Sequence, residues 1–253
     1  MKRIQPHIMC GPGDIAEYVL LPGDPQRVKL IAEHFDKCRK VAENREFITY
    51  TGTYRGIPVS ATSTGIGGPS ASIAVEELAN IGAKVFIRVG TTGSLQPDID
   101  VGEIVIAVAA VRSDGTSRCY IPLEYPAVAD YNVVLALVRA SKQLGVDPHV
   151  GIVWSYDAFY AESQEKINVW SKSRVLSVDC ESAPIFVVSS LRSLRAGSIM
   201  AVDGNLVKGT KKGEFMVGEE AGEHDPRVRE AIKKEISIAL EAIKILDGMS
   251  RRG

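Results

Sequence analysis

The sequence lacks the features that would place the protein in a membrane or in an oxidising compartment. No apolar run reaches the roughly 18 residues of a membrane-spanning helix. The N-terminal stretch MKRIQPHIMCGPGD has no continuous apolar core of the kind found in a signal peptide. The 4 cysteines show no C-x-x-C spacing, so neither a zinc site nor a disulfide framework is indicated. We therefore expect a reduced, soluble protein with a cytoplasmic location.

The sequence also has almost no net charge, which removes the electrostatic basis for binding nucleic acid or an anionic membrane. The 30 lysine and arginine residues nearly balance the 31 aspartate and glutamate residues, for a formal charge of −1. Two short basic clusters, Lys208 with Lys211 and Lys212, and Arg251 with Arg252, are typical of a solvated surface. An apolar fraction of 45% in 253 residues is that of an ordinary globular protein, which needs no cross-links to hold its core.

Strand and helix patterns alternate along the chain. Short apolar and β-branched runs predict strands at 18–21, 46–54, 58–63, 85–89, 103–111, 150–156, 175–179 and 198–203. Apolar residues at helical spacing predict helices at 25–35, 73–81, 131–144, 183–194 and 226–246. Such alternation predicts an α/β fold with three layers, in which helices flank a central mixed, largely parallel sheet. No linker or shift in composition divides the chain, so we expect a single domain over residues 1–253.

Residues 84–97, with the sequence KVFIRVGTTGSLQP, form the stretch around which the predicted site is organised. The run from Val85 to Val89 predicts a buried strand, and Gly90-Thr91-Thr92-Gly93-Ser94 predicts a loop at its end. Arg88 needs a partner there, either a bound anion or an internal Asp or Glu, because a buried unpaired charge is costly. The threonines and the loop N–H groups favour an oxygen-rich anion. This stretch contains neither G-x-G-x-x-G nor G-K-[ST], so it indicates an anion site without identifying the anion.

Two further groups of polar residues follow predicted strands. We expect them at the same crevice, because crossover connections bring the carboxyl ends of parallel strands together. The first group is Asp24, a predicted N-cap before Pro25, with Arg27 in the first helical turn. A helix N-terminus disfavours a cation unless an anion binds there. The second is Asp179-Cys180-Glu181, in which Glu181 either accepts hydrogen bonds from a pair of vicinal hydroxyls or caps the next helix.

Arginine side chains near one crevice point to a dianion. Arg27, Arg45 and Arg88 together suit phosphate, because guanidinium donors match its oxygens in pairs. Several candidate residues also have a simpler explanation. Arg45 fits a surface ion pair, His7 fits a solvated histidine, and Asp203 fits a turn residue. The residues alone therefore indicate an α/β protein that handles phosphate.

Several motifs resemble the hexameric type of purine-nucleoside and uridine phosphorylases. They are GDPQR at 23–27, STGIGGPS at 63–70, RVGTTGSLQPDI at 88–99 and LEYPAVAD at 123–130, and the resemblance covers about residues 4–246. VRSDG and LEYPAVAD are most similar to uridine phosphorylases, whereas DAFYAE and NLVKG are more similar to archaeal purine and methylthioadenosine phosphorylases. The resemblance implies phosphorolysis, in which a nucleoside and inorganic phosphate give a free base and ribose 1-phosphate. It also implies a homohexamer, a trimer of dimers with sites shared between subunits.

The resemblance implies a role for individual residues. Phosphate would be bound by Gly23, Arg27, Arg88 and Thr91, and by Arg45 from the neighbouring subunit of a dimer. The ribose would be held by Asp179, Cys180 and Glu181, with Glu181 on the 2′ and 3′ hydroxyls, and by His7 from the neighbour on the 5′ hydroxyl. The base would stack on Phe159, with Thr92, Gly93, Gln164, Lys166 and Asp203 around it. Arg88, Glu181 and Asp203 would be the catalytic residues.

The resemblance further implies that no cofactor is required beyond the phosphate co-substrate. In the related uridine enzymes the positions of Glu46, Ile66 and Ser70 correspond to a monovalent-cation site at the dimer interface, so K⁺ is expected there.

The base end departs from both family patterns. Purine enzymes have an Asp where this chain has Gly204, so Asp203 would have to act from one residue earlier. Uridine enzymes have Gln and Arg after the stacking Phe, whereas here Gln164 lies one place late and Lys166 replaces the Arg. Lysine lacks the bidentate fork of arginine. Cys180 likewise replaces the Met that usually precedes the ribose Glu.

Four functional hypotheses follow from these residues. The first is a uridine phosphorylase, and the alternative is a purine-nucleoside or methylthioadenosine phosphorylase with Asp203 as the general acid. A nucleosidase that uses water, and a nucleoside-binding regulator without activity, are both disfavoured because they leave the arginines without a dianion.

Overall fold

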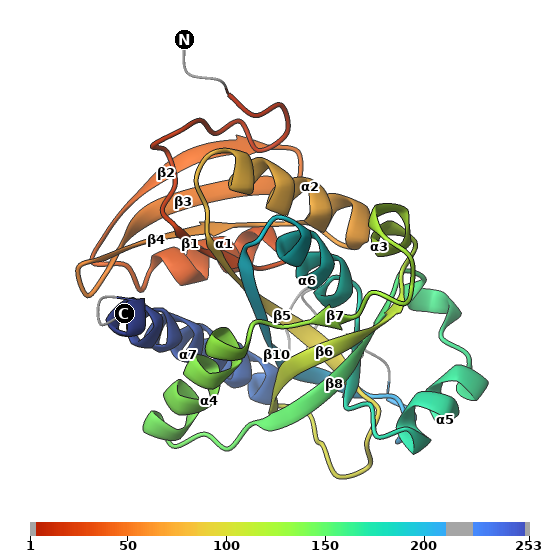
Figure 1. Ribbon diagram of the computed structural model, residues 1–253. Coiled ribbons are helices and arrows are strands. Elements are labelled where there is room, and N and C mark those ends of the chain that lie inside the picture. The colour runs from red at the N-terminus through yellow and green to blue at the C-terminus, as the bar shows by residue number, and fades with distance from the viewer. Residues whose placement is uncertain (1–3, 211–224, 251–253) are drawn as a thin grey trace, which may run out of the picture.

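The computed structural model describes residues 4–210 and 225–250 (Figure 1). The strands are β1 (Tyr18–Leu21), β2 (Lys37–Asn44), β3 (Phe47–Tyr54), β4 (Ile57–Thr62), β5 (Val85–Ser94), β6 (Ile104–Ser113), β7 (Ala127–Val128), β8 (His149–Tyr156), β9 (Ser177–Asp179) and β10 (Arg195–Asn205). The helices are α1 (Pro25–Ala32), α2 (Gly68–Asn80), α3 (Gly115–Tyr120), α4 (Tyr131–Gln143), α5 (Gln164–Lys172), α6 (Ser182–Leu191) and α7 (Pro226–Ser250), with a 3₁₀ turn, η1, at Phe159–Ala161. Lys211, Lys212, Arg251 and Arg252 of the predicted basic clusters lie outside the described residues.

The sheet is mixed, and part of it closes on itself. β5 pairs in parallel with β1 on one side and with β10 on the other. From β10 the pairing continues through β6, β8 and β9, and β9 returns to β5. These strands form a closed ring, from which β1, β4, β3 and β2 extend as an open sheet. The ring places β5, with Arg88 and Thr91, at the centre of the molecule.

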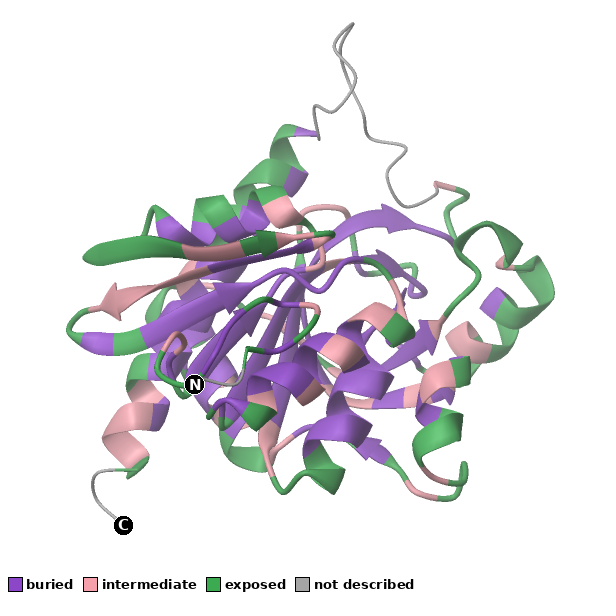
Figure 2. Cartoon of the chain, turned by 90° about the horizontal axis from the view of Figure 1, so that it is seen from above, coloured by how far each residue is buried: buried purple, intermediate pink, exposed green. Residues whose placement is uncertain are grey.

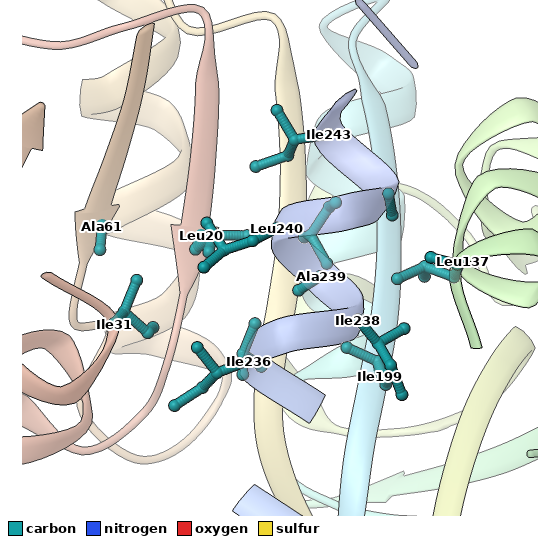
Figure 3. Close-up of a cluster of buried hydrophobic side chains, with 14 of the residues drawn as sticks. Leu20, Ile31, Ala61, Leu137, Ile199, Ile236, Ile238, Ala239, Leu240 and Ile243 are labelled. Carbon is teal, nitrogen blue, oxygen red and sulfur yellow. The ribbon is translucent and has the colours of Figure 1, made fainter. Parts of the chain in front are cut away.

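The alternation of side chains along β5 divides the interior into two cores, one on each face. Val85, Ile87 and Val89 pack with residues of α1, α4 and α7, whereas Phe86 packs with residues of α2 and α6. Figure 3 shows the first core, where Leu240 of α7 lies next to Leu20 of β1 and is surrounded by other aliphatic side chains. Buried residues follow most of the strands and the inner helix faces, whereas β2 and the outer helix faces are largely exposed (Figure 2). The predicted three-layer, single-domain α/β fold is confirmed.

Some elements differ from those that the sequence predicts. The Gly/Thr cluster after Val89 is not a loop, because β10 pairs alongside it as far as the pair Asn205–Ser94 and keeps it in the strand. The sequence did not predict β2, which is largely exposed and so has no apolar face to reveal it. It also missed α5, in which Ile167 is the buried residue, and the short helix α3. Helix α1 ends at Ala32, three residues before the predicted Phe35.

Candidate active site

A cavity of about 630 Å³ opens at the end of β1 and beside the middle of β5, next to the N-termini of α1 and α6. It collects residues that are far apart in the sequence, as expected for the carboxyl ends of parallel strands. Its lining consists of Gly23, Asp24, Pro25, Arg27, Glu46, Gly65, Ile66, Ser70, Arg88, Gly90, Thr91, Phe159, Asp179, Cys180, Glu181 and Asp203. The structure therefore brings together most of the residues predicted for the phosphate and ribose ends.

The N-terminus of α1 forms one wall of this cavity. The Asp24 carboxylate accepts a hydrogen bond of 2.8 Å from the Gln26 N–H, and Pro25 opens the helix, so the predicted cap is confirmed. Arg27 is 6% exposed, and its Nη1 donates to the Val89 carbonyl at 3.3 Å. Nη1 also lies 3.7 Å from Oε1 of Glu235 on α7. The helix N-terminus and the adjacent guanidinium place positive potential at one end of the cavity.

Arg88 lies on the floor of the cavity between two carboxylates. Its Nε donates to Oδ2 of Asp179 at 2.9 Å, and its Nη2 lies 2.6 Å from Oε2 of Glu181. Burial works to lower the pKa of Arg88, but the charges of Glu181 and Asp179 outweigh it and raise the pKa. Of the two kinds of partner predicted for this buried charge, the structure shows the internal acids, Asp179 and Glu181. The cavity lining leaves the same guanidinium accessible to an anion.

Glycine at position 90 makes room for that guanidinium. Arg88 and Gly90 lie two residues apart in β5 and therefore face the same side of the sheet. A Cβ on Gly90 would lie 2.7 Å from Cζ of Arg88, which is closer than van der Waals contact allows. The first glycine of the GTTG motif thus serves the side-chain packing of Arg88.

Asp179 and Glu181 have different structural tasks. Asp179 is 2% exposed and accepts from the Ser155 hydroxyl at 2.7 Å and from the Ser182 N–H and hydroxyl at 2.9 and 2.6 Å. It therefore ties β8, the start of α6 and Arg88 together. The Glu181 side chain makes no capping hydrogen bond with α6. Its Oε1 accepts from the Gly67 N–H at 2.7 Å, so Glu181 links the β4–α2 loop to Arg88.

A β-bulge brings Asp203 to the cavity. The register between β10 and β5 shifts between the pairs Val202–Thr92 and Gly204–Gly93, which leaves Asp203 as the extra residue. Asp203 is 7% exposed and lines the cavity, whereas Gly204 stays in the ladder. Thr92 and Gly93 remain in the strand, and the Thr92 hydroxyl donates to the Val178 carbonyl at 2.8 Å.

The residues proposed for the edge of the base are divided between two places. Phe159 of η1 lines the cavity and is 36% exposed. Gln164 and Lys166 lie on the surface of α5, outside the lining, where the Gln164 amide donates to Asn168 at 3.1 Å. The Lys166 ammonium donates to the Tyr156 hydroxyl at 2.8 Å and stands over that ring. Neither of these two side chains lines the cavity with Phe159.

His7 and Arg45 lie outside the cavity lining. The His7 Nδ1 is 2.6 Å from Oε1 of Glu77, and Oε2 of Glu77 accepts from the N–H groups of His7 and Ile8 at 3.0 and 2.9 Å. Because a carboxylate only accepts, Nδ1 carries the proton and Nε2 is left to act on another group. Arg45 is exposed at the turn between β2 and β3, with a left-handed φ of 54°.

Oxygen atoms that could act as ligands of a hard cation lie among the residues that line the cavity. The Ser70 hydroxyl donates to Oε1 of Glu46 at 2.7 Å, and this bond is the largest cause of the lowered pKa of Glu46. A carboxylate held ionised beside a hydroxyl offers oxygen ligands of the kind that hard cations take. Ile66 is 84% exposed and has only its main-chain oxygen to offer. In residues 4–210 and 225–250, no group of three or more His, Cys, Asp or Glu side chains forms a metal site.

Sequence reasoning placed Glu77 on the stripe of the helix at 73–81 but gave it no partner, and it missed a second buried acid, Glu235. Both lie on helices with apolar residues three or four positions away: Ile73 and Ala74 for Glu77, and Ile232 and Ile238 for Glu235. A carboxylate on an apolar helical face requires a partner, and that signal can be recognised in a sequence.

Within the described part of the chain, no helix has the length and apolar character needed to cross a membrane.

Comparison with known proteins identifies similar sequences and structures. The family model described as the phosphorylase superfamily matches residues 17–243. The chain is 45% identical to a uridine phosphorylase of Thermococcus kodakarensis, with 97% of this chain and 87% of that protein covered. It is 41% identical to a guanosine phosphorylase of Halorubrum lacusprofundi, with 96% and 99% covered. Among solved structures, a uridine phosphorylase from Vibrio fischeri has a TM-score of 0.85 at 33% identity, covering 95% and 96%. A purine nucleoside phosphorylase from Toxoplasma gondii has a TM-score of 0.88 at 32% identity, covering 96% of each chain.

Proposed function

The chain belongs to the phosphorylase superfamily, and from that membership we propose that it cleaves uridine with inorganic phosphate to give uracil and ribose 1-phosphate. One observation carries this proposal. Two buried arginines, Arg27 and Arg88, line a single cavity together with the carboxylate of Glu181. The arginines supply the charge that a dianion requires, and the carboxylate supplies acceptors for the hydroxyls of a sugar.

The phosphate end is the wall made by α1 and β5. Arg27 and Arg88 would donate to the phosphate oxygens, with Gly23 and Thr91 beside them in the cavity lining. Arg88 pairs with Asp179 and Glu181, so a bound dianion would share the guanidinium with these acids. Arg88 has donors beyond the two that face the carboxylates, because a guanidinium carries five N–H groups.

The ribose end is the start of α6. Glu181 would accept from the 2′ and 3′ hydroxyls, while Arg88 and the Gly67 N–H hold its carboxylate in place. Asp179 and Cys180 line the same part of the cavity, beneath the proposed sugar. A phosphate on Arg88 and a ribose on Glu181 would then be neighbours, as an attack of one on the other requires.

The proposed reaction is a displacement at the anomeric carbon. A phosphate oxygen forms a bond to C1′, and the bond from C1′ to the base breaks with its electron pair passing to the base, which then takes up a proton. The sugar passes through an oxocarbenium-like state, which the adjacent dianion stabilises. Positioning and fixed charge supply the rate enhancement, so no cofactor beyond phosphate is part of this proposal.

The base end also supports a second candidate, a purine nucleoside phosphorylase. Asp203 reaches the cavity through the bulge in β10, whereas Gln164 and Lys166 do not line it. An acid at that place would protonate a departing purine, and one relative is named a guanosine phosphorylase. Phe159 would stack on either type of base.

A release assay tests the proposal directly. Purified protein is incubated with uridine, inosine, guanosine or methylthioadenosine, each with and without phosphate, and free base and ribose 1-phosphate are measured by chromatography. We expect uracil and ribose 1-phosphate in equal amounts, and only with phosphate. Release of purine bases instead would favour the second candidate, and release of any base without phosphate would indicate a nucleosidase.

Asp203→Asn separates the two candidates. If Asp203 is the acid for a purine, its loss lowers kcat for purine nucleosides by about 10²–10⁴-fold, the usual contribution of general acid catalysis. If the base is uracil and Asp203 only lines the cavity, kcat for uridine changes little. Asp98→Asn, at an exposed aspartate, serves as the matched control. Equal losses with both classes of base would contradict a selective role in protonation.

We further propose a homohexamer built from dimers that share their sites. His7 on the N-terminal arm and Arg45 at the β2–β3 turn lie outside the cavity of their own chain, and Glu77 holds His7 with Nε2 available. Each is proposed to complete the site of a neighbour, His7 at the ribose and Arg45 at the phosphate. K⁺ is proposed to bind between Glu46, Ser70 and the main chain of Ile66 near the same interface.

Mixing two inactive variants tests the shared site. Subunits of Arg45→Ala and Arg88→Ala are dissociated, combined in equal amounts and reassembled. One site in each mixed dimer then has an intact Arg88 of its own and an intact Arg45 from its neighbour, so we expect about a quarter of the wild-type activity to return. Mass measurement of the mixed dimers controls for exchange. Proven exchange without recovery would show that Arg45 acts within its own subunit.

A further inference from the structure

A buried carboxyl group stands behind the proposed phosphate site and has no part in the reaction described above. Glu235 is on α7, its side chain is fully buried, and its Oε1 lies 3.7 Å from Nη1 of Arg27. The main-chain N–H of Ala201 favours the charged form of Glu235, but within the described part of the chain neither carboxyl oxygen has a well-formed hydrogen bond. A buried acid with this little support is costly to ionise, so a specific reason for its position is needed.

Glu235 faces charged groups from three other elements. They are Arg27 of α1, Arg88 of β5 and Asp203 of β10, and all three line the cavity. From α4, which also packs on α7, the apolar residues Val133, Ala136, Leu137 and Ala140 enter the shared core. The carboxyl group of Glu235 is therefore surrounded by the charges of the proposed site on one side and by hydrocarbon on the other.

Burial decides the protonation of Glu235. It raises the pKa of this carboxyl to about 8, although the charges of Arg27 and Arg88 oppose the rise. The group is therefore mostly neutral at pH 7 and becomes ionised above about pH 8. In the neutral form it leaves the charge of Arg27 uncompensated, and in the ionised form it pairs with Arg27 at 3.7 Å.

We propose that Glu235 is a proton-linked positioning residue, whose neutral carboxyl leaves Arg27 available to a dianion and whose ionised carboxylate competes with that dianion for Arg27. The inference rests on the proposed function, because it assumes that phosphate binds at Arg27. Linkage makes the effect reciprocal: a bound dianion favours the protonated form of Glu235, so binding takes up a proton from solvent near pH 8. No bond other than O–H is made or broken.

The test uses sulfate, which remains a dianion across the neutral and alkaline range and so removes the ionisation of phosphate itself. Its affinity for the wild-type protein and for Glu235→Gln is measured by calorimetry from pH 6.5 to 9.5. We expect wild-type affinity to fall by roughly 5- to 150-fold, the usual range for such coupling, as the pH passes 8. The affinity of Glu235→Gln should stay high and nearly constant. Glu230→Gln, on the exposed face of α7, should behave as wild type.

A second measurement needs no variant and guards against misfolding of Glu235→Gln. Wild-type binding of sulfate at pH 8 is measured in two buffers that differ in ionisation enthalpy, which reports the number of protons taken up. Uptake of a fraction of a proton supports the inference. Binding without uptake, or parallel pH profiles for wild type and Glu235→Gln, overturns it while the phosphate site stands. If neither sulfate nor phosphate binds the wild-type protein, the phosphate site itself is overturned, and the inference with it.

Discussion

Replacing Arg88 with alanine is expected to lower kcat/KM for phosphorolysis by roughly 10²–10³-fold, the loss typical of one preorganised donor at a reacting centre. Arg88 is the only arginine in the described cavity that touches both the proposed phosphate site and the proposed ribose carboxylate, at 2.6 Å from Glu181. Its removal takes a charge from the phosphate and leaves Glu181 without its anchor. We therefore expect both KM for phosphate and kcat to change.

The same substitution is expected to reduce stability. Arg88→Ala leaves Asp179 and Glu181 as two buried acids without a cation, and breaking such a buried pair costs about 3–5 kcal/mol. Thermal unfolding must therefore be measured alongside the kinetics, at a temperature where the variant remains folded. Arg88→Lys is the second variant, since it keeps the charge but loses the planar fork.

The kinetic pattern of the two variants decides the role of Arg88. If the fork binds phosphate, Arg88→Lys recovers stability but little of kcat/KM. Arg192→Ala, at a surface arginine paired with Glu76, serves as the control for loss of an arginine elsewhere. A folded Arg88→Ala protein with near-normal kcat/KM would remove Arg88 from the site and leave it as a structural residue.

The sequence predicts the core of this site because the relevant signals are local. A charge inside an apolar run, as at Arg88, and an Asp-Pro pair that starts a helix, as at Asp24, can be recognised within a few residues. Both predictions depend on backbone geometry that the segment itself determines. The position of Glu181 follows for a similar reason, because a short strand, β9, leads directly into α6.

Features that depend on pairing between distant strands were not predictable. The strand character of Gly90 to Ser94 comes from β10, more than a hundred residues later, and so does the bulge that directs Asp203 to the cavity. The link between Glu235 and Arg27 likewise joins the last helix to the first. In each case the determining contact is tertiary, so neither propensity nor periodicity carries it.

Glu181→Ala is expected to weaken nucleoside binding far more than phosphate binding. The carboxylate would accept hydrogen bonds from two ribose hydroxyls, and a hydrogen bond to a charged group contributes about 1.5–3 kcal/mol. Loss of both corresponds to a fall of roughly 10²- to 10⁴-fold in kcat/KM for uridine. KM for phosphate should stay the same or decrease, because Arg88 then shares its charge with Asp179 alone.

Comparison of substrates isolates the hydroxyl contact from general damage to the site. The wild-type protein should prefer uridine to 2′-deoxyuridine, and Glu181→Ala should lose most of that preference, because the carboxylate that distinguishes them is gone. Glu181→Gln keeps the shape of the side chain and an acceptor oxygen, so it should retain part of the preference. Glu165→Ala, at an exposed glutamate of α5, is the matched control. Equal losses for phosphate and nucleoside, with the preference for ribose unchanged, would mean that Glu181 serves to hold Arg88 and does not contact the sugar.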